Sequence, residues 1–557
     1  MNLRDKKEVL IIVPKFRMDT TRKHRVAPAV PIGLGFISAI LKENGYHVEF
    51  LNLYLYESIS EEEICNYFLK KDYDYILTGG LSAHYRCIKN CVELARKYAP
   101  NAQVILGGGI ISSQPELMFQ ALGPDYIVVG EGELTIVELL RHLQNRWDLS
   151  AVDAIGFRDQ GKLVLTRPRN PIKDLDSLPW ADYEGLGIDY ILNNTYPSQS
   201  FNYDWVDYPR PYPILASRSC PYLCTFCFHP IGNKYRQRSV ANIMEEIHFA
   251  INRYQINCID IYDELFAHDR QRVYDFCREI TRLSNSVNYE IKWGCQMRVD
   301  NTDKDLIKTM KDAGCNVLFL GLESYNPFVL KSMRKKTTPQ QIDYTLKLAR
   351  NANLTVQGNF IFGDVAETKE TACETLNYWK NNHNSFGGGV SLDFIQLYPG
   401  TQLYKYALKN KIINDEIDFV ENHIFDPINI TKEMTDREFN ELFIDIIDAR
   451  HRYSKYQMPV KRRRKSGAYE THVKCPYCNE MSIYGNYIPP GFKSYHINDI
   501  CCRNCRIRFH IVSLPFNIFI RLFMVTPSKL QPFIYAMMPF MKSLIRKVIS
   551  LLTKSHG

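Results

Sequence analysis

No uninterrupted apolar run in this chain of 557 residues reaches the length of about 20 residues that a membrane-spanning helix needs. The apolar run at residues 9–13 is too short for the core of a signal peptide, and no small-residue cleavage site follows it. The 16 cysteines cluster in metal-type spacings, which argues against a disulfide framework. These absences predict a cytoplasmic protein with reduced thiols.

Net positive charge is absent from residues 1–450, where 58 acidic residues outnumber 51 Lys and Arg, and is concentrated at the end of the chain. Residues 451–557 hold 18 Lys and Arg against three acidic residues, although the net charge of the whole chain is only +8. Such a basic tail suits an anionic partner, either a nucleic acid or a membrane surface. Apolar runs at 511–520 and 533–541 alternate with basic residues, which favours an interfacial amphipathic segment. A helical hairpin packed on the rest of the protein is the alternative.

Residues 1–150 alternate short apolar runs with helical patterns, which predicts an α/β domain with a doubly wound parallel sheet. Strands are expected near 9–13, 47–53, 75–78, 104–106 and 126–129. Glycines stand where several of these strands end. Ligands bind at the carboxyl ends of strands in such sheets, where glycine permits close approach of the backbone. Tight turns are the alternative interpretation of the same glycines.

Residues 205–410 contain six further strand–helix units, with strands near 214–217, 258–262, 290–294, 317–322, 355–362 and 390–397. They predict a partial (βα)6 barrel, an open relative of the βα barrel. Residues 151–204 are expected to form a connector, which includes a hairpin at 153–166. Because active groups of βα barrels sit at the carboxyl ends of the strands, polar residues at those ends are informative.

Three cysteines, Cys220, Cys224 and Cys227, follow the first barrel strand, and the next cysteine is Cys258. A 4Fe–4S cluster usually takes four thiolates. Three thiolates leave one iron open, and an open coordination position marks a catalytic metal site. Three buried structural cysteines are the alternative, but Pro221 and the tight spacing favour a loop wrapped around a cluster.

This C-x-x-x-C-x-x-C stretch resembles the signature of the radical S-adenosylmethionine (SAM) superfamily, and Phe226 before the third cysteine fits the same pattern. The resemblance implies that the open iron is chelated by the amino and carboxylate groups of SAM. It also implies reductive cleavage of SAM to a 5′-deoxyadenosyl radical, with an electron donor such as flavodoxin or ferredoxin.

Polar residues at the barrel strand ends are expected to hold SAM. Carboxylates can accept hydrogen bonds from its ammonium or ribose hydroxyls, and a guanidinium suits its carboxylate. The resemblance supports these positions, because Tyr262-Asp263-Glu264 and Gly321-Leu322-Glu323-Ser324 match family elements after the second and fourth strands. A solvated or salt-bridged surface residue is the alternative for each acid. No catalytic side chain is assigned. The predicted SAM contacts are Phe226, Asp263, Glu264, Arg298, Glu323 and Ser324.

The N-terminal glycine motifs resemble the cobalamin-binding domain that precedes many radical SAM cores. They are Pro31-Ile32-Gly33-Leu34-Gly35, the triple glycine 107–109 and Gly130-Glu131-Gly132-Glu133. The Asp-x-His-x-x-Gly motif that supplies a lower axial histidine is absent, so no histidine is expected below the cobalt. The predicted cobalamin contacts are Pro31, Gly33, Leu34, Gly79, Ser82, Gly107, Gly108, Gly130 and Glu131.

Two C-x-x-C pairs, Cys475 with Cys478 and Cys502 with Cys505, are separated by 23 residues. Such pairs form tetrahedral thiolate sites, most often for structural zinc. An auxiliary iron–sulfur cluster is the alternative, because four thiolates suit either metal. We expect a helical basic linker at 411–470, a small zinc-ribbon-like module at 471–510 and an amphipathic tail at 511–557.

These resemblances imply a cobalamin-dependent radical SAM enzyme, with C-methylation of an unactivated carbon in a small molecule or lipid as the leading hypothesis. An oxidoreductase, cyclase or rearrangement enzyme without methyl transfer is the alternative. An RNA-modifying radical SAM enzyme is a further alternative. The N-terminal domain lacks the methylthiotransferase cysteines, however, and no RNA-binding module follows the barrel, so nucleic acid is not the expected partner. A lipid substrate would fit peripheral membrane contact through the tail.

Overall fold

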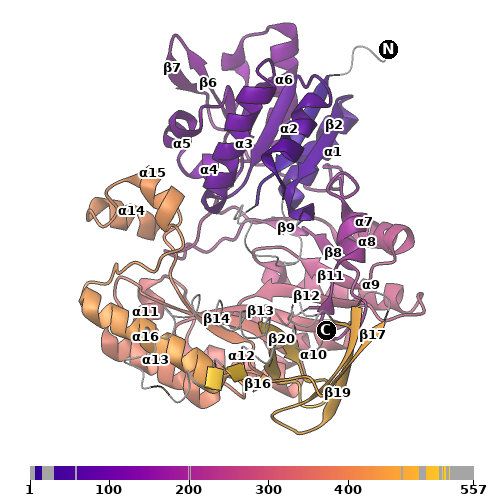
Figure 1. The fold of residues 1–557 in the computed structure, drawn as a ribbon, viewed down its shortest axis with the longest axis vertical. Helices are drawn as coiled ribbons and strands as arrows, with labels where there is room; N and C mark the ends of the chain where they lie inside the picture. Colours follow the sequence, from indigo (N-terminus) through magenta and orange to yellow (C-terminus); the bar gives the residue numbers. More distant parts are fainter. Residues whose placement is uncertain are drawn as a thin grey trace, which may run out of the picture.

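The computed structural model describes residues 7–15, 30–56, 59–197, 200, 202–465, 468–487, 497–512, 517–518, 520–521 and 526. Two parallel sheets with flanking helices form an N-terminal lobe and a barrel lobe, which Figure 1 shows one above the other. The predicted apolar run 533–541 lies outside the described residues.

The N-terminal lobe contains a seven-stranded sheet in the order β2-β1-β3-β4-β5-β6-β7. Its first strand, β1, is apolar and almost fully buried from Val9 to Val13, as expected for a parallel strand covered on both faces. The predicted doubly wound sheet is confirmed. The parallel strands are β1 (Glu8–Val13), β2 (His47–Asn52), β3 (Tyr75–Gly79), β4 (Gln103–Gly107) and β5 (Tyr126–Val128), and the helices are α1 (Ile32–Glu43), α2 (Glu61–Leu69), α3 (Tyr85–Tyr98), α4 (Gly109–Ser113), α5 (Pro115–Leu122) and α6 (Glu133–Asn145).

The predicted hairpin forms as β6 (Ile155–Asp159) and β7 (Lys162–Leu165), but it does not belong to a connector. β6 pairs antiparallel with β5 and extends the N-terminal sheet. The expected boundary at residue 150 is therefore wrong, and the first lobe continues to residue 165. The hairpin covers the edge of β5, which would otherwise present unpaired backbone groups.

The barrel lobe contains a six-stranded sheet in the order β15-β14-β13-β12-β11-β8, with every pair parallel. This confirms the predicted partial barrel. Its strands are β8 (Pro211–Ile214), β11 (Cys258–Ile261), β12 (Lys292–Met297), β13 (Cys315–Glu323), β14 (Thr355–Phe362) and β15 (Val390–Phe394), and its helices are α8 (Val240–Tyr254), α9 (Arg270–Ser284), α10 (Lys304–Asp312), α11 (Pro327–Ser332), α12 (Pro339–Asn351) and α13 (Lys369–Asn382). A separate two-stranded sheet, β9 (Ser217–Arg218) with β10 (Arg236–Gln237), follows β8.

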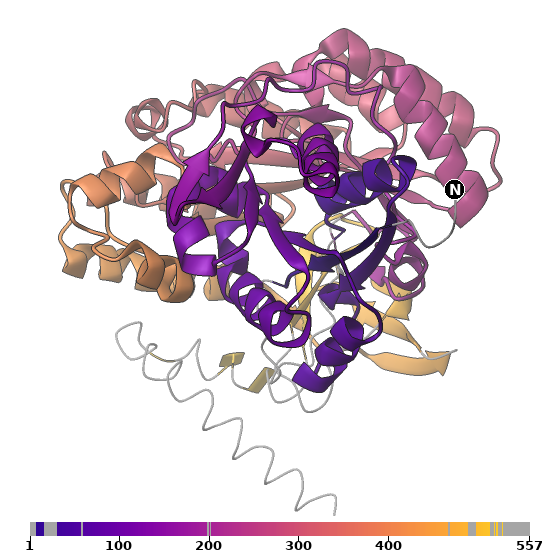
Figure 2. The ribbon, with the colours of Figure 1, turned by 90° about the horizontal axis from the view of Figure 1, so that it is seen from above.

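The segment after the barrel packs back onto the N-terminal lobe. It contains α14 (Gln402–Lys409), α15 (Glu416–Asp418) and the π-helical η7 (Phe419–His423). Tyr404 and Phe419 share one buried core with Leu10 and Ile88 of the first sheet and its helix. A shared core therefore joins the two lobes in addition to the connecting chain. Seen from above, the N-terminal lobe lies over the centre of the barrel lobe (Figure 2).

The C-terminal segment differs from the predicted helical linker. After α16 (Asp436–Tyr453), the basic run forms strand β17 (Lys461–Lys465), which pairs antiparallel with β18. The described module therefore begins near residue 456 and not at 471. Its strands form two sheets, β17-β18-β19 and β16-β21-β20, built from β16 (Tyr456–Gln457), β18 (Ala468–Lys474), β19 (Met481–Tyr487), β20 (Ile497–Cys501) and β21 (Arg508–Val512). No helix in the described part of the chain is both long and apolar enough to cross a membrane.

The shared core gives a stability prediction. Phe419→Ala should lower the free energy of unfolding by about 3–5 kcal/mol, because it leaves a cavity between the lobes. Phe328→Ala should have little effect, since Phe328 is 62% exposed. Chemical denaturation followed by fluorescence measures both. Equal losses for the two variants would contradict a shared core at Phe419.

Candidate active site between the lobes

The loop that carries Cys220, Cys224 and Cys227 is fixed at its start by Asp263, which follows β11. The Asp263 carboxylate accepts hydrogen bonds from the Ala216 N–H and the Ser217 hydroxyl, each at 2.6 Å. Asp263 is 1% exposed, and its two partners occupy both carboxylate oxygens. The structure therefore gives Asp263 a role in holding the loop.

The far end of the loop is held by the residues that follow α11. The Thr225 N–H donates to the Met333 carbonyl at 3.1 Å, and the Cys224 thiol lies 4.0 Å from the Arg334 carbonyl. The Arg298 guanidinium stacks on the Tyr222 ring, 3.6 Å from its centroid. The cysteine loop is thus clamped on both sides before any cofactor is considered.

The electrostatic surroundings of the loop favour a thiolate at Cys224 but not at the other two cysteines, because burial raises the pKa of Cys220 and the hydrogen bond with Cys224 raises the pKa of Cys227. A hydrogen bond from Cys227, together with the nearby charges of Lys335 and Arg298, lowers the pKa of Cys224 to about 6, although burial opposes the shift. The thiolate is the form of cysteine that binds metals. Three thiols on one clamped loop suit an iron–sulfur cluster, in which each sulfur binds a different iron.

The predicted SAM residues fall into two groups. Glu264 and Glu323 carry charges that act on the loop cysteines, and Arg298 lies against the loop. By contrast, Ser324 accepts a hydrogen bond from Asn326 N–H and meets the Thr375 hydroxyl at 3.2 Å, so it serves the packing of α13. Phe226 packs against the interlobe core.

Two of the charged residues already have partners in this chain. Glu323 pairs with Lys335 at 2.6 Å, and both are buried. Arg298 pairs with Asp300 at 2.8 Å and donates to the Lys335 carbonyl at 2.5 Å. The sequence did not identify Lys335, because it stands in a short basic run, and such runs are typical of solvent-exposed surfaces. Its contact with Glu323 exists only in the fold.

Glu264 differs from these residues. It is exposed, and no described residue forms a hydrogen bond or ion pair with it. Although its side chain is accessible, the atoms packed around its carboxylate shield it from bulk water, and this desolvation, with the nearby charge of Asp263, raises its pKa. Glu264 is therefore the acid at this strand end that remains available to an external group.

The interior of the barrel sheet also presents accessible polar side chains. Gln296, Asn359 and Ser391 are exposed although each lies within a strand of the parallel sheet. Asn359 and Ser391 are register partners on neighbouring strands, and their side chains hydrogen bond at 2.9 Å. Tyr262, at the end of β11, is 49% exposed. An open, polar interior of this kind is suited to a bound substrate.

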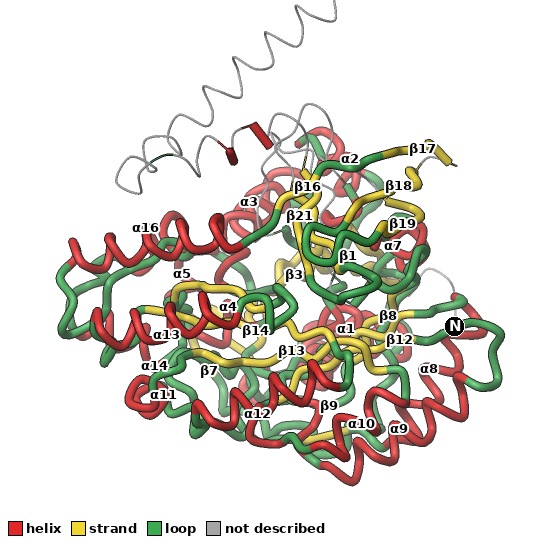
Figure 3. Tube along the Cα trace, turned by 90° about the horizontal axis from the view of Figure 1, so that it is seen from below, coloured by secondary structure: helices red, strands yellow, loops and turns green. Residues whose placement is uncertain are grey.

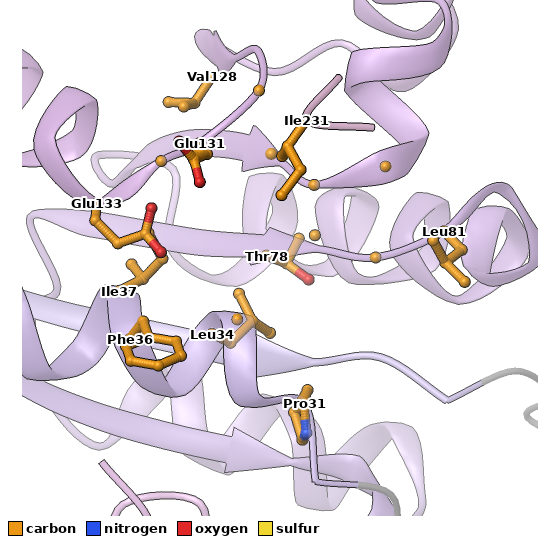
Figure 4. Close-up of a pocket in the computed structure, with 18 of the residues that line it drawn as sticks. Pro31, Leu34, Phe36, Ile37, Thr78, Leu81, Val128, Glu131, Glu133 and Ile231 are labelled. Carbon is orange, nitrogen blue, oxygen red and sulfur yellow. The ribbon is translucent and has the colours of Figure 1, made fainter. Parts of the chain in front are cut away.

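A cavity of about 560 Å³ lies at the carboxyl edge of the N-terminal sheet. Figure 4 shows Thr78, Val128, Leu34 and Phe36 around it. This volume is typical of a cofactor or ligand site. The structure brings eight of the nine predicted cobalamin residues into its lining: Pro31, Gly33, Leu34, Gly79, Gly107, Gly108, Gly130 and Glu131. Ser82, the ninth, does not line the cavity and is buried.

The lining is largely apolar, and its glycines leave space open. A Cβ added at Gly33 or Gly130 would meet no atom within 4 Å, so these glycines leave the space open. A Cβ at Gly79 would lie 2.6 Å from the Gly107 carbonyl oxygen, which shows why two strand ends can approach closely here. The lining mixes few polar groups with many apolar ones, as in most cofactor sites.

One histidine, His84, stands among the described residues that line the cavity. Its Nδ1 accepts the Leu81 N–H at 3.0 Å, and burial lowers its pKa to about 4. The nitrogen nearest the loop backbone is therefore engaged within the protein. The His84 Nε2 lies 3.5 Å from the Tyr54 hydroxyl.

The cavity opens toward the barrel lobe. Leu215, Ser219, Tyr262 and Glu264 complete its lining, and all four belong to the loop region after β8 or β11. Of the predicted SAM contacts, Glu264 lines the cavity, and Ser219 in its lining directly precedes Cys220, so the cavity borders the start of the cysteine loop.

Four buried charges hold the lobes together beside this site. Arg218 on β9 pairs with Glu131 at 2.9 Å and with Glu133 at 2.6 Å, and Arg236 on β10 pairs with Glu131 at 2.8 Å. Each of the four side chains is only 6–7% exposed. Burial opposes ionisation of Glu131, but the two arginines hold its pKa below the usual range. Glu131, predicted as a cobalamin contact, therefore also joins the lobes.

Comparisons with known proteins agree with this architecture. Residues 214–378 match the radical SAM superfamily, and residues 22–140 match the B12 binding domain. The chain therefore carries a B12-binding domain ahead of a radical SAM domain. The predicted family is confirmed, and the protein is an enzyme of this class.

Individual relatives differ in the reactions they are named for. The chain is 27% identical over 421 residues to an "uncharacterized methyltransferase" of Pyrococcus horikoshii, which covers 74% of this chain and 85% of the relative. It is 25% identical over 362 residues to the anaerobic magnesium-protoporphyrin IX monomethyl ester cyclase of Cereibacter sphaeroides, covering 62% of this chain and 55% of that protein. The solved structure of the cobalamin-dependent radical enzyme OxsB, with aqua-cobalamin and SAM bound, has a TM-score of 0.62 at 17% identity and covers 80% of this chain and 67% of its own. At that identity the likeness shows the fold.

The buried charges between the lobes give a second prediction. Arg218→Met should destabilise the protein by about 3–5 kcal/mol, because it leaves Glu133 buried without its partner. The double variant Arg218→Met, Glu133→Gln should lose less than the sum of the two single variants. Denaturation of all four proteins measures the coupling, and simple additivity would contradict a direct buried pair.

Glu367, after β14, gives a pH prediction. Burial and the charge of Asp364 raise its pKa to about 8, although its carboxylate accepts the Gly363 N–H at 2.5 Å. The folded state therefore holds a proton that the unfolded chain loses above pH ~4, so stability should fall as pH rises from about 5 to 8. Glu367→Gln should reduce this fall by a few kcal/mol, while the exposed Glu370→Gln should not. Parallel curves for Glu367→Gln and the wild type would contradict the prediction.

Proposed function

We propose that this protein is a cobalamin-dependent radical SAM C-methyltransferase that acts on an unactivated carbon of a small-molecule or lipid substrate. The observation that carries the proposal is the cavity between the lobes. The apolar cavity of the B12-binding domain opens onto the strand ends beside the three-cysteine loop. A methyl carrier and a radical source can act on one substrate carbon only if they face the same space.

The described residues of this chain would bind the cofactors and position the cysteine loop. Cys220, Cys224 and Cys227 would hold three irons of a 4Fe–4S cluster, and Glu264 would accept hydrogen bonds from the ammonium or ribose hydroxyls of SAM. Bound there, the cluster would supply the electron that cleaves SAM, and cobalamin would supply the methyl group. Asp263 and residues 333–335 would keep the cysteine loop in place.

The exclusion of water is a further task of the site. A reactive radical needs a closed space, and the apolar lining from Leu34, Phe36 and Leu215 would provide it on the cavity side. The polar interior formed by Gln296, Asn359 and Ser391 would orient a substrate through hydrogen bonds. An enzyme of this class also needs a reductant, and we propose a flavodoxin or ferredoxin for that role.

A cyclase or rearrangement enzyme is the second candidate. The similarity to the magnesium-protoporphyrin cyclase favours it, since that relative is named as a cyclase and not as a methyltransferase. The longer coverage of the Pyrococcus relative, 85% of its length, favours methyl transfer. Both candidates need the same radical step, so the first experiment tests what they share.

The radical step is tested by 5′-deoxyadenosine formation from SAM under anaerobic, reducing conditions. Cys220→Ser should abolish the product, because the cluster loses one of its three ligands. Cys373→Ser on α13 is the matched control and should retain it. No 5′-deoxyadenosine from a wild-type protein with an intact cluster would overturn the proposal.

The cobalamin site is tested by a variant that blocks the cavity without harming the fold. Gly33→Leu places a side chain in open space on α1, so it should prevent retention of hydroxocobalamin through gel filtration. It should not destabilise the protein, because leucine favours a helix over glycine by up to about 1 kcal/mol. Glu43→Leu, exposed on the same helix, should retain cobalamin. Retention by Gly33→Leu would place cobalamin elsewhere.

Methyl transfer is tested by supplying a metabolite extract and SAM with a deuterated methyl group to the reduced holoenzyme. A product that carries the deuterated methyl group supports C-methylation. Formation of 5′-deoxyadenosine together with an unlabelled new product would favour cyclisation or rearrangement.

A further inference from the structure

A second constellation of cysteines lies far from the active site. Cys475 and Cys478 follow β18, and Cys502 and Cys505 lie between β20 and β21. The sulfurs of Cys475 and Cys505 are 3.7 Å apart, as are those of Cys478 and Cys502, and all four lie within 4.8 Å of one another. Four thiols gathered this closely are a candidate site for one metal ion.

The spacing discriminates between the two metals that the sequence allowed. A tetrahedral zinc ion with Zn–S bonds of about 2.3 Å places its sulfurs roughly 3.8 Å apart. The thiolates of a 4Fe–4S cluster lie further apart, because each binds a different iron. The neighbouring Cys501 is not part of the group; its thiol lies 3.9 Å from the Cys502 carbonyl. The geometry is that of a single ion with four sulfur ligands.

The surroundings of the four sulfurs also fit a metal centre. The Tyr477 N–H lies 3.4 Å from the Cys475 sulfur, and the Asn504 amide lies 3.6 Å from the Cys478 sulfur. Such donors offset the negative charge that thiolates bring to a metal. The apolar core around them is small: Val473, Cys475, Tyr484, Ile500, Cys502, Phe509 and Ile511. A core of this size is too small to stabilise a module alone, and small modules commonly use a structural metal.

Three arginines that flank these cysteines attach the module to the barrel. Arg508 forms a buried ion pair with Asp204, and Arg503 pairs with Asp207. The Arg506 guanidinium lies 4.3 Å from the centroid of the Trp205 ring. All three partners belong to the segment 202–208, which precedes the first barrel strand.

This segment forms the floor of the barrel. The Tyr203 hydroxyl donates to Asp260 at 2.6 Å, and the Asn202 amide donates to Asp260 and to the Ile259 carbonyl. Asp260 stands two residues before Tyr262, which lines the active-site cavity. The segment is therefore in direct contact with the strand that leads to the active site.

The module lies at the amino ends of the barrel strands. Arg506 donates to the Asn353 carbonyl at 3.1 Å, just before β14, and the Arg508 N–H donates to the Gly387 carbonyl at 2.8 Å, before β15. The cysteine loop of the active site stands at the carboxyl ends, and nine-residue β13 spans roughly 25 Å between the two ends. Figure 3 views the molecule from below, with β16, β18, β19 and β21 close together. A metal there cannot touch SAM or substrate.

We propose that Cys475, Cys478, Cys502 and Cys505 bind one structural zinc ion, which holds Arg503, Arg506 and Arg508 against residues 202–208 and so closes the floor of the barrel. The ion fixes the two C-x-x-C turns, and the arginines stand within or directly after the second turn. Without the ion, no bond joins the two C-x-x-C turns, and the turn that carries the arginines loses its geometry.

The metal is tested on the wild-type chain, where no variant can fail to fold. Elemental analysis should find about one zinc per chain in addition to cluster iron, and zinc X-ray absorption should show four sulfurs at about 2.3 Å. Cys478→Ser should lose the zinc, while the matched control Cys501→Ser should keep it. Iron in place of zinc, nitrogen or oxygen ligands, or zinc loss in Cys501→Ser would overturn the assignment.

The closure of the floor is tested by hydrogen exchange of residues 202–208 in the full chain. Zinc removal by a chelator should raise exchange there by at least about tenfold, since breaking a buried ion pair destabilises by more than that factor. Arg508→Met should raise exchange in the same segment but keep its zinc, because Arg508 is not a ligand. Unchanged exchange after zinc removal, or zinc loss in Arg508→Met, would overturn the proposed link between the ion and the floor.

Discussion

The architecture depends on a buried set of charges at the junction of the two lobes. Arg218 and Arg236 stand opposite each other in the β9–β10 pair, where two like charges would repel. Glu131 and Glu133, at the start of α6 in the other lobe, offset both charges. Neither lobe can bury its half of this set alone, so the charges specify which surfaces meet.

That junction determines the chemistry available to the enzyme. Arg218 is two residues before Cys220, and Glu131 lines the cavity of the B12-binding domain. The same contacts that join the lobes therefore set the position of the cysteine loop relative to the cavity. At the opposite end of the barrel, arginines of the C-terminal module contact residues 202–208 through ion pairs and a cation–π interaction. One end of the barrel thus faces the cofactor cavity, and the other is closed by chain-internal contacts.

Sequence patterns predicted the positions of residues at strand ends better than those of residues in short helices or at domain boundaries. The glycines predicted at strand ends line one cavity, because a parallel sheet brings the carboxyl ends of its strands to one edge whatever the packing above it. Ser82 does not line this cavity, because it stands in the short helix after β3 with its side chain buried. The boundary at residue 150 failed because a hairpin joins whichever sheet has an open edge, and sequence periodicity does not show that edge.

The sequence by itself determined the family, the two parallel sheets and the metal-type cysteine spacings, because these depend on local patterns of apolar residues, glycine and cysteine. Only the tertiary structure decided which charged residues are available. Asp263, Arg298 and Glu323 have their partners in Ala216 and Ser217, Asp300 and Lys335, whereas Glu264 has none among the described residues. Except for Arg298 and Asp300, which are two residues apart, these pairings join positions at least 12 residues apart in the chain. The free energy of burying a charge selects such pairings only once the strands have met.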